Sequence, residues 1–244
     1  MLAAGVWAAR VWAGGLSAAG ELAAGVSAAG PGARVKAVVL AGGDVVVTPY
    51  LLELLEGSRL VIAADSGLRH AEPLGLAPAL VVGDFDSVTK EVLASFPDLP
   101  RHQHPVDKDR LDLELAIDMA LERGAEELLV LGAFGSRFDQ SLAALLICAR
   151  LSRAGVRISL HDGARDGYVV PGGSALSLEL PDATVFSLLA LEESRCSVDG
   201  AEYRLDDVRL PFGVGLGVAN RARGGPRLEV RTGLVALLVE RSLE

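Results

Sequence analysis

The chain has 244 residues, of which half are hydrophobic and 5% aromatic, and its formal net charge at pH 7 is −9. This length and apolar content suffice for a sizeable core in one large domain or two small ones. The negative charge argues against a nucleic-acid or anionic-membrane surface, because such partners bind basic patches. An anionic ligand would therefore have to be met locally, by a metal ion or by a few Arg and Lys side chains.

The two cysteines, Cys148 and Cys196, lie far apart and do not have the spacing of metal ligands. Cys148 falls in an apolar helical pattern, so we interpret it as a reduced thiol in the core. From this cysteine usage we expect a cytoplasmic protein.

Residues 1–34 form an Ala/Gly-rich, low-complexity extension in which "AAG" recurs. They contain neither the run of about 20 apolar residues that a transmembrane helix needs nor the positive charge that precedes the apolar stretch of a signal peptide. We predict that this extension carries no chemistry, and whether the mature protein retains it stays open.

From Val35 onward, short apolar runs alternate with helical patterns. The clearest helix covers 109–124, where apolar residues recur at i, i+3, i+4, i+7 and i+8 and Gly124 supplies the stop. Such alternation indicates a mostly parallel sheet covered on both faces, with right-handed crossovers. We predict a strand and a turn over 35–44, strands over 59–67, 79–87 and 156–163, and a strand and a loop over 126–136. The other predicted helices are 48–58 and 139–155, and 68–78 is a short helical or irregular segment.

After Gly163 the pattern changes to short runs separated by Gly, Pro and Asp, without a long helical period. This pattern is typical of a small antiparallel β domain. We place the boundary at about 162–172 and predict an α/β domain over 35–165 followed by a β domain over 166–244.

Acidic residues follow the predicted strands. Asp65 follows the second strand, and Asp84 and Asp86 follow the third, in "GDFDS". Ligands of parallel α/β sheets bind at the carboxyl ends of the strands, so these groups should gather there. Residues i and i+2 of an extended backbone share a side, which predicts that Asp84 and Asp86 face one space while Phe85 turns away to pack.

Such crowding of carboxylates is unfavourable by itself. Two carboxylates about 5 Å apart repel by roughly 3 kcal/mol at an effective dielectric constant near 20, so the cluster must hold protons or a cation. Oxygen ligands favour Mg²⁺ or Ca²⁺, and Mg²⁺ usually comes with substrate phosphates.

A second acidic cluster, in "DKDRLDLE", contains Asp107, Asp109 and Asp112 at the start of the clearest helix. These residues could bind a metal. Alternatively, Asp109 is the N-cap and Asp112 closes a capping box, with both favoured by the helix dipole.

The segment "GAFGSRFDQS" offers groups for a phosphate. Gly132 and Gly135 flank a turn whose amides could approach an anion, and Arg137 carries a fork suited to phosphate oxygens. Lys108 would be a second cation. Asp139 could cap the following helix, or could simply form a surface ion pair with Arg137.

Three further features are weaker. The Gly42–Gly43 turn either faces a phosphate or merely ends a strand. His102 and His104 lie between prolines, in what we predict to be a loop without further ligands. His70 is interpreted as a solvated or capping side chain.

Taken together, these motifs resemble the thiamine pyrophosphokinase family over about residues 35–244. The matching order is "ADSG" at 64–67, "GDFDS" at 83–87, "DKDRLD" at 107–112, "GSRFDQ" at 135–140 and "GLGVAN" at 215–220. The resemblance implies a Rossmann-like α/β domain followed by a β-sandwich, usually assembled as a homodimer. It also implies Mg²⁺-dependent transfer of a pyrophosphoryl group from ATP to the hydroxyethyl oxygen of thiamine, with AMP as the second product.

The resemblance further implies roles for individual residues. Asp84, Asp86 and Asp112 would be metal ligands or would hold the metal's waters, with Asp65 beside them toward the substrate hydroxyl. Tyr203 and Asn220 would meet thiamine across the dimer interface. The residues expected around the nucleotide and its phosphates are Lys108, Asp109, Gly135, Arg137, Asp139 and Gln140.

The chain departs from the family pattern at Ser66, Leu111 and Ala219, where Gly, Thr and Ser are common. Loss of a neutral hydrogen bond at Ala219 would cost about 1 kcal/mol of thiamine binding. Two alternatives therefore stay open: a related pyrophosphokinase that acts on a hydroxymethyl pterin, and a nucleotide-binding module without catalysis.

Overall fold

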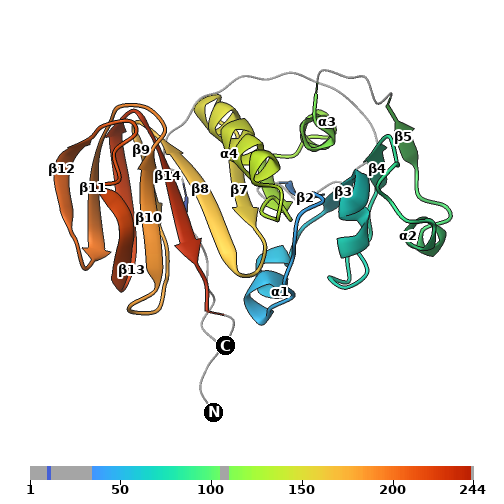
Figure 1. Cartoon of the computed structure of the whole chain (residues 1–244), viewed down its shortest axis with the longest axis horizontal. Helices are drawn as coiled ribbons and strands as arrows, with labels where there is room; N and C mark the ends of the chain where they lie inside the picture. The colour runs from blue at the N-terminus through green and yellow to red at the C-terminus, as the bar shows by residue number, and fades with distance from the viewer. Residues whose placement is uncertain (1–9, 12–34, 105–109, 243–244) are drawn as a thin grey trace, which may run out of the picture. The chain divides into compact units, whose positions relative to one another are not determined.

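The computed structural model describes residues 10–11, 35–104 and 110–242. These residues form two compact units, divided between Asp166 and Gly167 inside strand β8 (Arg165–Pro171). We call described residues 35–166 the α/β unit and residues 10–11 with 167–242 the β unit. Strand pairs are parallel in the first and antiparallel in the second, so the chain has a mixed α/β fold (Figure 1).

The α/β unit contains a parallel sheet in the order β7-β6-β2-β3-β4-β5. All five residues of β3 are buried, which explains its continuous apolar sequence, because a strand covered on both faces has no polar side. The strands are β2 (Lys36–Leu40), β3 (Leu60–Ala64), β4 (Leu80–Gly83), β5 (Arg101–Gln103), β6 (Glu127–Leu131) and β7 (Arg157–His161).

Helical segments join these strands. They are α1 (Pro49–Leu55), the 3₁₀ helix η1 (Asp65–His70), α2 (Lys90–Ser95), α3 (Asp112–Glu122) and α4 (Phe138–Arg153). The hydroxyl of Thr48 caps α1 by accepting the Leu51 N–H at 3.1 Å. Helix α3 packs on β2, β3 and β4, and α4 packs on β7 (Figure 1).

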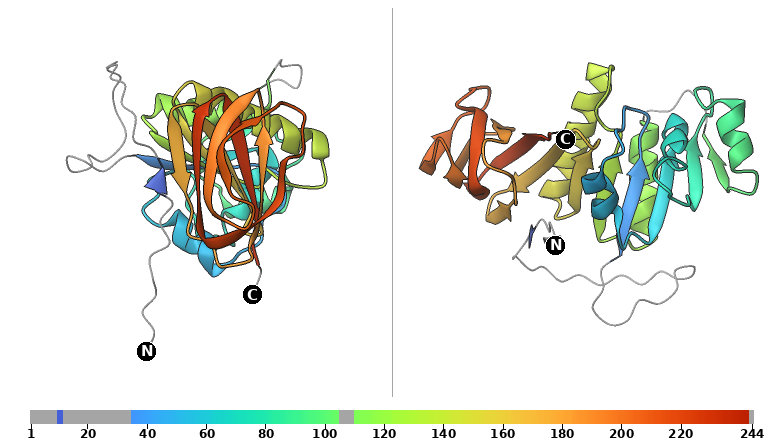
Figure 2. Two further views of the ribbon diagram at one scale, coloured as in Figure 1. Left: turned by 90° about the vertical axis from the view of Figure 1, so that its left-hand side faces the viewer. Right: turned by 90° about the horizontal axis from the view of Figure 1, so that it is seen from below.

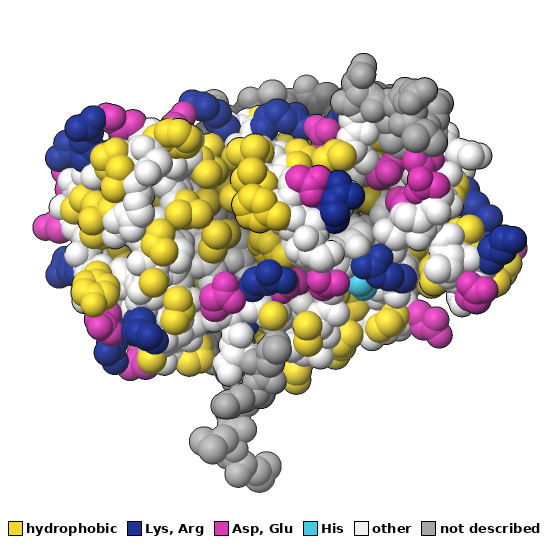
Figure 3. All heavy atoms as spheres, viewed as in Figure 1, with side chains coloured by type: hydrophobic (Ala, Val, Ile, Leu, Met, Phe, Trp, Pro, Cys, Tyr) yellow, Lys and Arg dark blue, Asp and Glu magenta, His cyan; other side chains and the backbone are white. Residues whose placement is uncertain are grey.

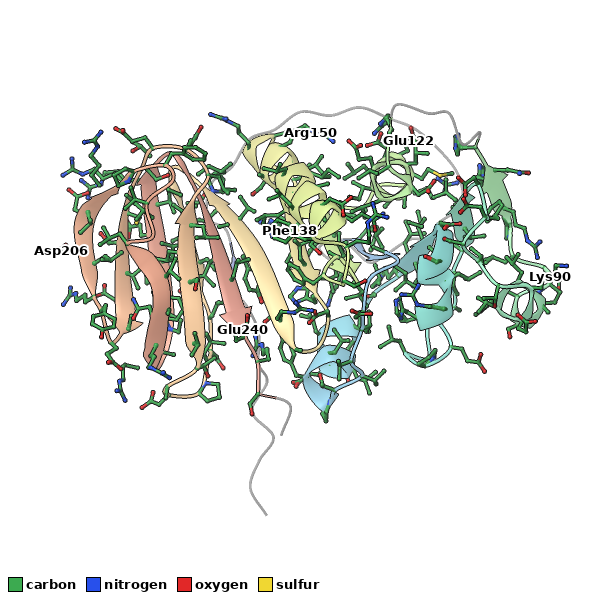
Figure 4. The ribbon with its side chains drawn as sticks, viewed as in Figure 1. Lys90, Glu122, Phe138, Arg150, Asp206 and Glu240 are labelled. Carbon is green, nitrogen blue, oxygen red and sulfur yellow. The ribbon has the colours of Figure 1, made fainter. Side chains whose placement is uncertain are left out.

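Two elements of this unit are missing from the sequence prediction. Helix α2 begins at Lys90, labelled in Figure 4, and strand β5 lies where a loop around His102 was expected. All three residues of β5 are exposed. An edge strand with exposed side chains shows no apolar alternation, so periodicity cannot detect it.

The β unit is built from antiparallel strands around a core that includes Phe186 and Leu188 (Figure 2). The long strand β13 pairs with β10 through its first residues and with β9 and β11 through its later ones. Between the two parts, Gly224 and Gly225 have φ of 79° and 86°, a conformation that favours glycine and lets the strand bend. The other strands are β9 (Ser174–Ser177), β10 (Val185–Ala190), β11 (Ser194–Ala201), β12 (Leu205–Leu210), β13 (Gly217–Thr232) and β14 (Leu234–Glu240).

Within the Ala/Gly-rich extension, the structure describes only a two-residue strand, β1 (Arg10–Val11), which pairs antiparallel with β9. The sequence did not predict this strand. On the face shown in Figure 3, acidic and basic side chains are interspersed. Among the described residues, no helix combines the length and the apolar character needed to cross a bilayer.

Candidate active site

The carboxyl ends of the parallel strands enclose a cavity of about 280 Å³ in the α/β unit. The turn after β2, the start of η1 after β3, the start of α3 and the loop between β6 and α4 form its walls. The cavity therefore lies where ligands of parallel α/β sheets bind. It is lined by residues 41–44, 64–66, 69, 87, 111–113, 132, 133, 135–137, 140, 141 and 144.

Three aspartates that the sequence singled out come together beside this cavity. Carboxylate oxygens of Asp65, Asp84 and Asp86, one from each residue, all lie within 4.8 Å of one another. The hydrogen bond and charge of Asp84 raise the pKa of Asp86, and the charges of Asp65 and Asp112 add to that rise. The group is thus a concentrated negative site, and hard oxygen donors of this kind suit Mg²⁺ or Ca²⁺.

The Asp65 carboxylate is buried and only partly hydrogen-bonded. The residue is 9% exposed, its backbone has φ of 44°, and the Ser87 hydroxyl donates a hydrogen bond to its Oδ2. Its Oδ1 is buried and has no hydrogen-bond partner among the described residues. A buried unpaired acceptor costs about 1–3 kcal/mol, so this oxygen is suited to receive a cation or a substrate hydroxyl.

The neighbouring Gly83 makes the position of Asp65 possible. A Cβ at residue 83 would lie 2.9 Å from the Asp65 Cβ, closer than real Cβ atoms come to one another. The glycine of "GDFDS" is therefore required for the close approach of two strand ends.

Asp84 and Asp86 face the same region, as expected, but the reason differs from the expected one. The backbone is not extended there, since Phe85 has φ of 64° and the Asp86 N–H donates to Asp84 Oδ1 at 3.1 Å. This is a local turn closed by an aspartate side chain. Phe85 still packs against the buried core.

Asp112 lines the cavity as the first residue of α3. The capping-box interpretation of Asp112 is wrong, because Leu111 is the N-cap and Glu114 accepts the Leu111 N–H at 3.4 Å. The other residues expected at this helix start, Lys108 and Asp109, lie outside the described residues.

Two amides of the turn after β2 are engaged within the protein. Gly43 N–H donates to the Gly132 carbonyl at 2.7 Å, and Asp44 N–H donates to the Phe134 carbonyl at 2.8 Å. A Cβ at Gly43 would lie 2.3 Å from the Phe134 carbonyl oxygen. Gly43 therefore allows two loops to touch, and the Gly42–Gly43 turn that ends β2 also lines the cavity.

The loop after β6 uses its amides in the same way. Gly132 N–H donates to the His161 carbonyl at 3.1 Å, and Gly135 N–H donates to Ser141 Oγ at 3.2 Å. Both glycines line the cavity. The N–H groups of these two glycines are therefore engaged within the protein, and the approach of the turn to a phosphate stays a prediction.

Arg137 and Gln140 line the cavity at the start of α4, beside Phe138, labelled in Figure 4. Arg137 forms a bidentate ion pair with Asp139, with Nε to Oδ1 at 3.0 Å and Nη2 to Oδ2 at 2.6 Å. The guanidinium lowers the pKa of Asp139. Asp139 lies in the first turn of α4 and the N-cap is Arg137, so the capping role suggested for Asp139 is wrong.

Arg69 on η1 also lines the cavity and was missed from the sequence. Its guanidinium donates to the carbonyls of Gly42, Gly43 and Ser66, at 2.6, 2.8 and 3.2 Å. The adjacent His70 is half-buried, contacts the Gly43 carbonyl at 2.8 Å through Nε2 and has its pKa lowered by burial. No local motif marks Arg69, because two of its three partners lie on the loop after the neighbouring strand β2.

In the β unit, Asn220 is used internally. It is 3% exposed, its Oδ1 accepts the N–H groups of Tyr203 and Arg221 at 3.0 and 2.8 Å, and its Nδ2 donates to the Tyr203 carbonyl at 2.8 Å. The Tyr203 side chain is 64% exposed. Asn220 thus fixes the backbone of Tyr203, and the tyrosine ring is the accessible group of the two.

The remaining sequence candidates do not form a site among the described residues. The group of side chains there that could hold a metal ion consists of Asp65, Asp84 and Asp86 and does not include His102 or His104. The cysteines Cys148 and Cys196 are both buried and free.

Comparison with known proteins matches residues 51–160 to the family model described as "Thiamin pyrophosphokinase, catalytic domain". This range contains Asp65, Asp84, Asp86, Asp112 and Arg137. A thiamine pyrophosphokinase of Bacillus subtilis (strain 168) is 26% identical over 188 residues, which cover 75% of this chain and 87% of the relative. Thiamin pyrophosphokinase 1 of Caenorhabditis elegans is 26% identical over 153 residues, covering 59% and 62%.

The fold is also similar to solved structures. The crystal structure of thiamine pyrophosphokinase from Bacillus subtilis matches with a TM-score of 0.75 and 24% identity, over 85% of this chain and 100% of that one. Thiamin pyrophosphokinase from Candida albicans matches with a TM-score of 0.71 and 13% identity, over 85% and 90%. At these identities the likeness concerns the fold.

Proposed function

We propose that this chain, a member of the thiamine pyrophosphokinase family, transfers a pyrophosphoryl group from ATP to the hydroxyethyl oxygen of thiamine. The observation that carries the proposal is the convergence of Asp65, Asp84 and Asp86 at a cavity within the region that matches the family's catalytic domain. In this reaction the thiamine oxygen attacks the β-phosphorus of ATP. The bond from that phosphorus to the bridging oxygen of the α-phosphate breaks, which leaves AMP and thiamine diphosphate.

We propose Mg²⁺ as the cofactor, held by Asp84, Asp86 and Asp112 directly or through water. The fit of these residues is supported by the close carboxylates and by the buried, unpartnered Oδ1 of Asp65 next to them. When bound, Mg²⁺ supplies neutralisation of phosphate charge. The aspartates hold their positions through the GDFDS turn and the start of α3, so the protein provides a preorganised site.

Asp65 is proposed to orient the thiamine hydroxyl and to take its proton. A primary alcohol is a poor nucleophile, and a positioned carboxylate can accept its proton as the new bond forms. The Ser87 hydroxyl binds Oδ2, which leaves Oδ1 for the substrate. Asp65 would then be a catalytic residue beside the metal ligands.

Around the nucleotide we propose the residues expected from the sequence: Lys108, Asp109, Gly135, Arg137, Asp139 and Gln140. Arg137, Gln140 and Gly135 line the cavity. Asp139 does not line it and instead pairs with Arg137, so its proposed role is to hold the guanidinium. This explains why an acidic residue accompanies a phosphate-binding cation.

For thiamine we propose Tyr203 and Asn220 as binding residues, with Asn220 acting through the backbone of Tyr203.

We further propose a Rossmann-like domain over 35–165, a β-sandwich over 166–244 and a homodimer in which the β-sandwich of one chain helps to bind thiamine. The division of the described residues at 166/167 and the exposed Tyr203 ring support these proposals. The two buried free thiols are compatible with the cytoplasmic location that we propose.

The two alternatives are not favoured. The matched family model and the curated relatives are all described as thiamine pyrophosphokinases, which speaks against a pterin as acceptor. The same relatives are named as enzymes, which speaks against a binding module without catalysis.

The test is to incubate the purified chain with ATP, Mg²⁺ and thiamine and to separate the products by chromatography. We expect equal amounts of AMP and thiamine diphosphate, and no product when EDTA is added. A parallel reaction with a hydroxymethyl pterin tests the other acceptor. AMP formation with the pterin but not with thiamine would contradict the proposal, and so would an absence of AMP with both.

A further inference from the structure

Four backbone amides at the cavity of the α/β unit are already engaged within the protein. The amides of Gly43, Asp44, Gly132 and Gly135 all donate to other groups of the protein. These four N–H groups are therefore not available to a phosphate. The cationic side chains that line the cavity are a further source of donors.

Arg69 is one of these cations, and its hydrogen bonds leave part of its guanidinium unused. A guanidinium has five N–H groups. In Arg69, two on Nη2 and one on Nη1 are donated to the carbonyls of Gly42, Gly43 and Ser66. The Nε–H and the second Nη1–H remain for a ligand. The three carbonyl contacts also restrict the side chain, so little entropy would be lost when a ligand binds it.

Arg69 also keeps its charge uncompensated. Its partners among the described residues are backbone carbonyls, and no carboxylate pairs with it. Arg137, by contrast, is already engaged by Asp139 in a bidentate ion pair. Carbonyl oxygens stabilise a cation without neutralising it, so the attraction of Arg69 for an anion is retained.

We propose that Arg69 binds a phosphate group of the nucleotide through its Nε–H and its free Nη1–H, while its other three N–H groups hold the Gly42–Gly43 turn and the Ser66 carbonyl. The identity of the anion as ATP rests on the proposed function, whereas the binding of a phosphate by Arg69 does not require catalysis. The same side chain would thus hold a turn that lines the cavity and bind the phosphate inside it.

The first experiment measures binding of ATP with Mg²⁺, and of adenosine, to wild type and to Arg69→Gln by calorimetry without thiamine. We expect the variant to bind ATP about tenfold or more weakly, the size expected for loss of a hydrogen bond to a charged group. Adenosine binding should change less than about twofold, because adenosine has no phosphate. Arg59→Gln, at an exposed arginine outside the cavity lining, is the matched control and should match wild type.

This design separates phosphate binding from a merely structural role. If Arg69 only supported the turn, both ligands would weaken together, and that outcome would overturn the proposal, as would unchanged ATP binding. A wild type that binds ATP but forms no AMP with thiamine would contradict the proposed function and leave the Arg69 comparison valid.

A second measurement on the wild type does not depend on how the variant folds. Arg69 is exposed and should react with phenylglyoxal, with modification located by peptide mass spectrometry. We expect ATP with Mg²⁺ to slow modification of Arg69 by about tenfold, in line with occupation of most sites, while adenosine has no effect and Arg59 stays equally reactive. Equal modification of Arg69 with and without ATP would overturn the proposal.

Discussion

Asp65 and Asn220 are both buried polar residues in motifs that the sequence marks for ligand binding, yet the two units use them in opposite ways. Asp65 keeps one carboxylate oxygen buried and without a partner among the described residues. Asn220 uses its amide for three hydrogen bonds to the backbone of residues 203 and 221. A buried group without a partner costs stability and is retained for a ligand, whereas a satisfied group stabilises the fold.

The same contrast exists between the aspartate cluster and the glycine turns. The carboxylates of Asp84 and Asp86 repel each other, as the raised pKa of Asp86 indicates. The turn at Gly43 has its amide satisfied by a carbonyl of the facing loop. The unfavourable repulsion between carboxylates is therefore concentrated at the aspartates. These are the residues expected to bind a cation.

The largest expected effect is at the cluster. Asp84→Asn should lower the rate of thiamine diphosphate formation by about 10³-fold, because one of the groups that hold the charge-neutralising metal is lost. Circular dichroism should be unchanged. Asp98→Asn, at an exposed aspartate outside the cavity lining, is the control and should keep full activity. Retention of activity in Asp84→Asn would remove the cluster from the mechanism.

The next effect concerns the unpartnered oxygen. Asp65→Asn should lower the turnover number by about 10²-fold, the size of a lost general base, with ATP binding little changed. Ser87→Ala, which removes only the hydrogen bond to Oδ2, should cause a smaller loss. If Asp65→Asn left turnover intact while Asp84→Asn abolished it, the role proposed for Asp65 would be wrong.

A third prediction concerns Asn220, the buried residue whose hydrogen bonds are all made within the protein. Asn220→Ala should lower the free energy of unfolding by about 2–3 kcal/mol, since three hydrogen bonds of about 1 kcal/mol each are lost. ATP binding should not change. Tyr203→Ala, which removes an exposed ring, should leave the stability nearly unaffected. Urea denaturation of wild type and the two variants measures the free energy of unfolding. An Asn220→Ala protein as stable as wild type would show that the hydrogen bonds of Asn220 do not stabilise the fold.

The smallest effect is the pH dependence of the cluster. The pKa of Asp86 is raised by Asp84 in the folded chain. Its contribution to stability is therefore present at pH values below its unfolded pKa and is lost as the pH rises through the folded pKa. Without Mg²⁺, Asp86→Asn should raise the melting temperature at neutral pH and have no effect near pH 3. An equal shift at both pH values would show that charge repulsion is not the cause.

The amino-acid sequence was sufficient to predict the buried strands and the helices α1, α3 and α4 of the α/β unit, because buried strands and amphipathic helices have strong local signatures. The apolar run at β3 and the period of α3 are examples. The exposed edge strand β5 lacked such a signature. The position of the aspartates after the strands also followed from local sequence, since strand ends of a parallel sheet share one edge.

The tertiary structure alone decided how the polar atoms are paired. The Arg69 guanidinium meets carbonyls of residues 42 and 43, which are 27 and 26 positions away, and Asn220 in β13 meets Tyr203 in the turn between β11 and β12, 17 positions away. Hydrogen bonds depend on distances of a few tenths of an ångström and on direction, and the order of residues does not encode these across the chain. Sequence thus determined which charges reach the sheet edge, and folding determined which of them remain available to a ligand.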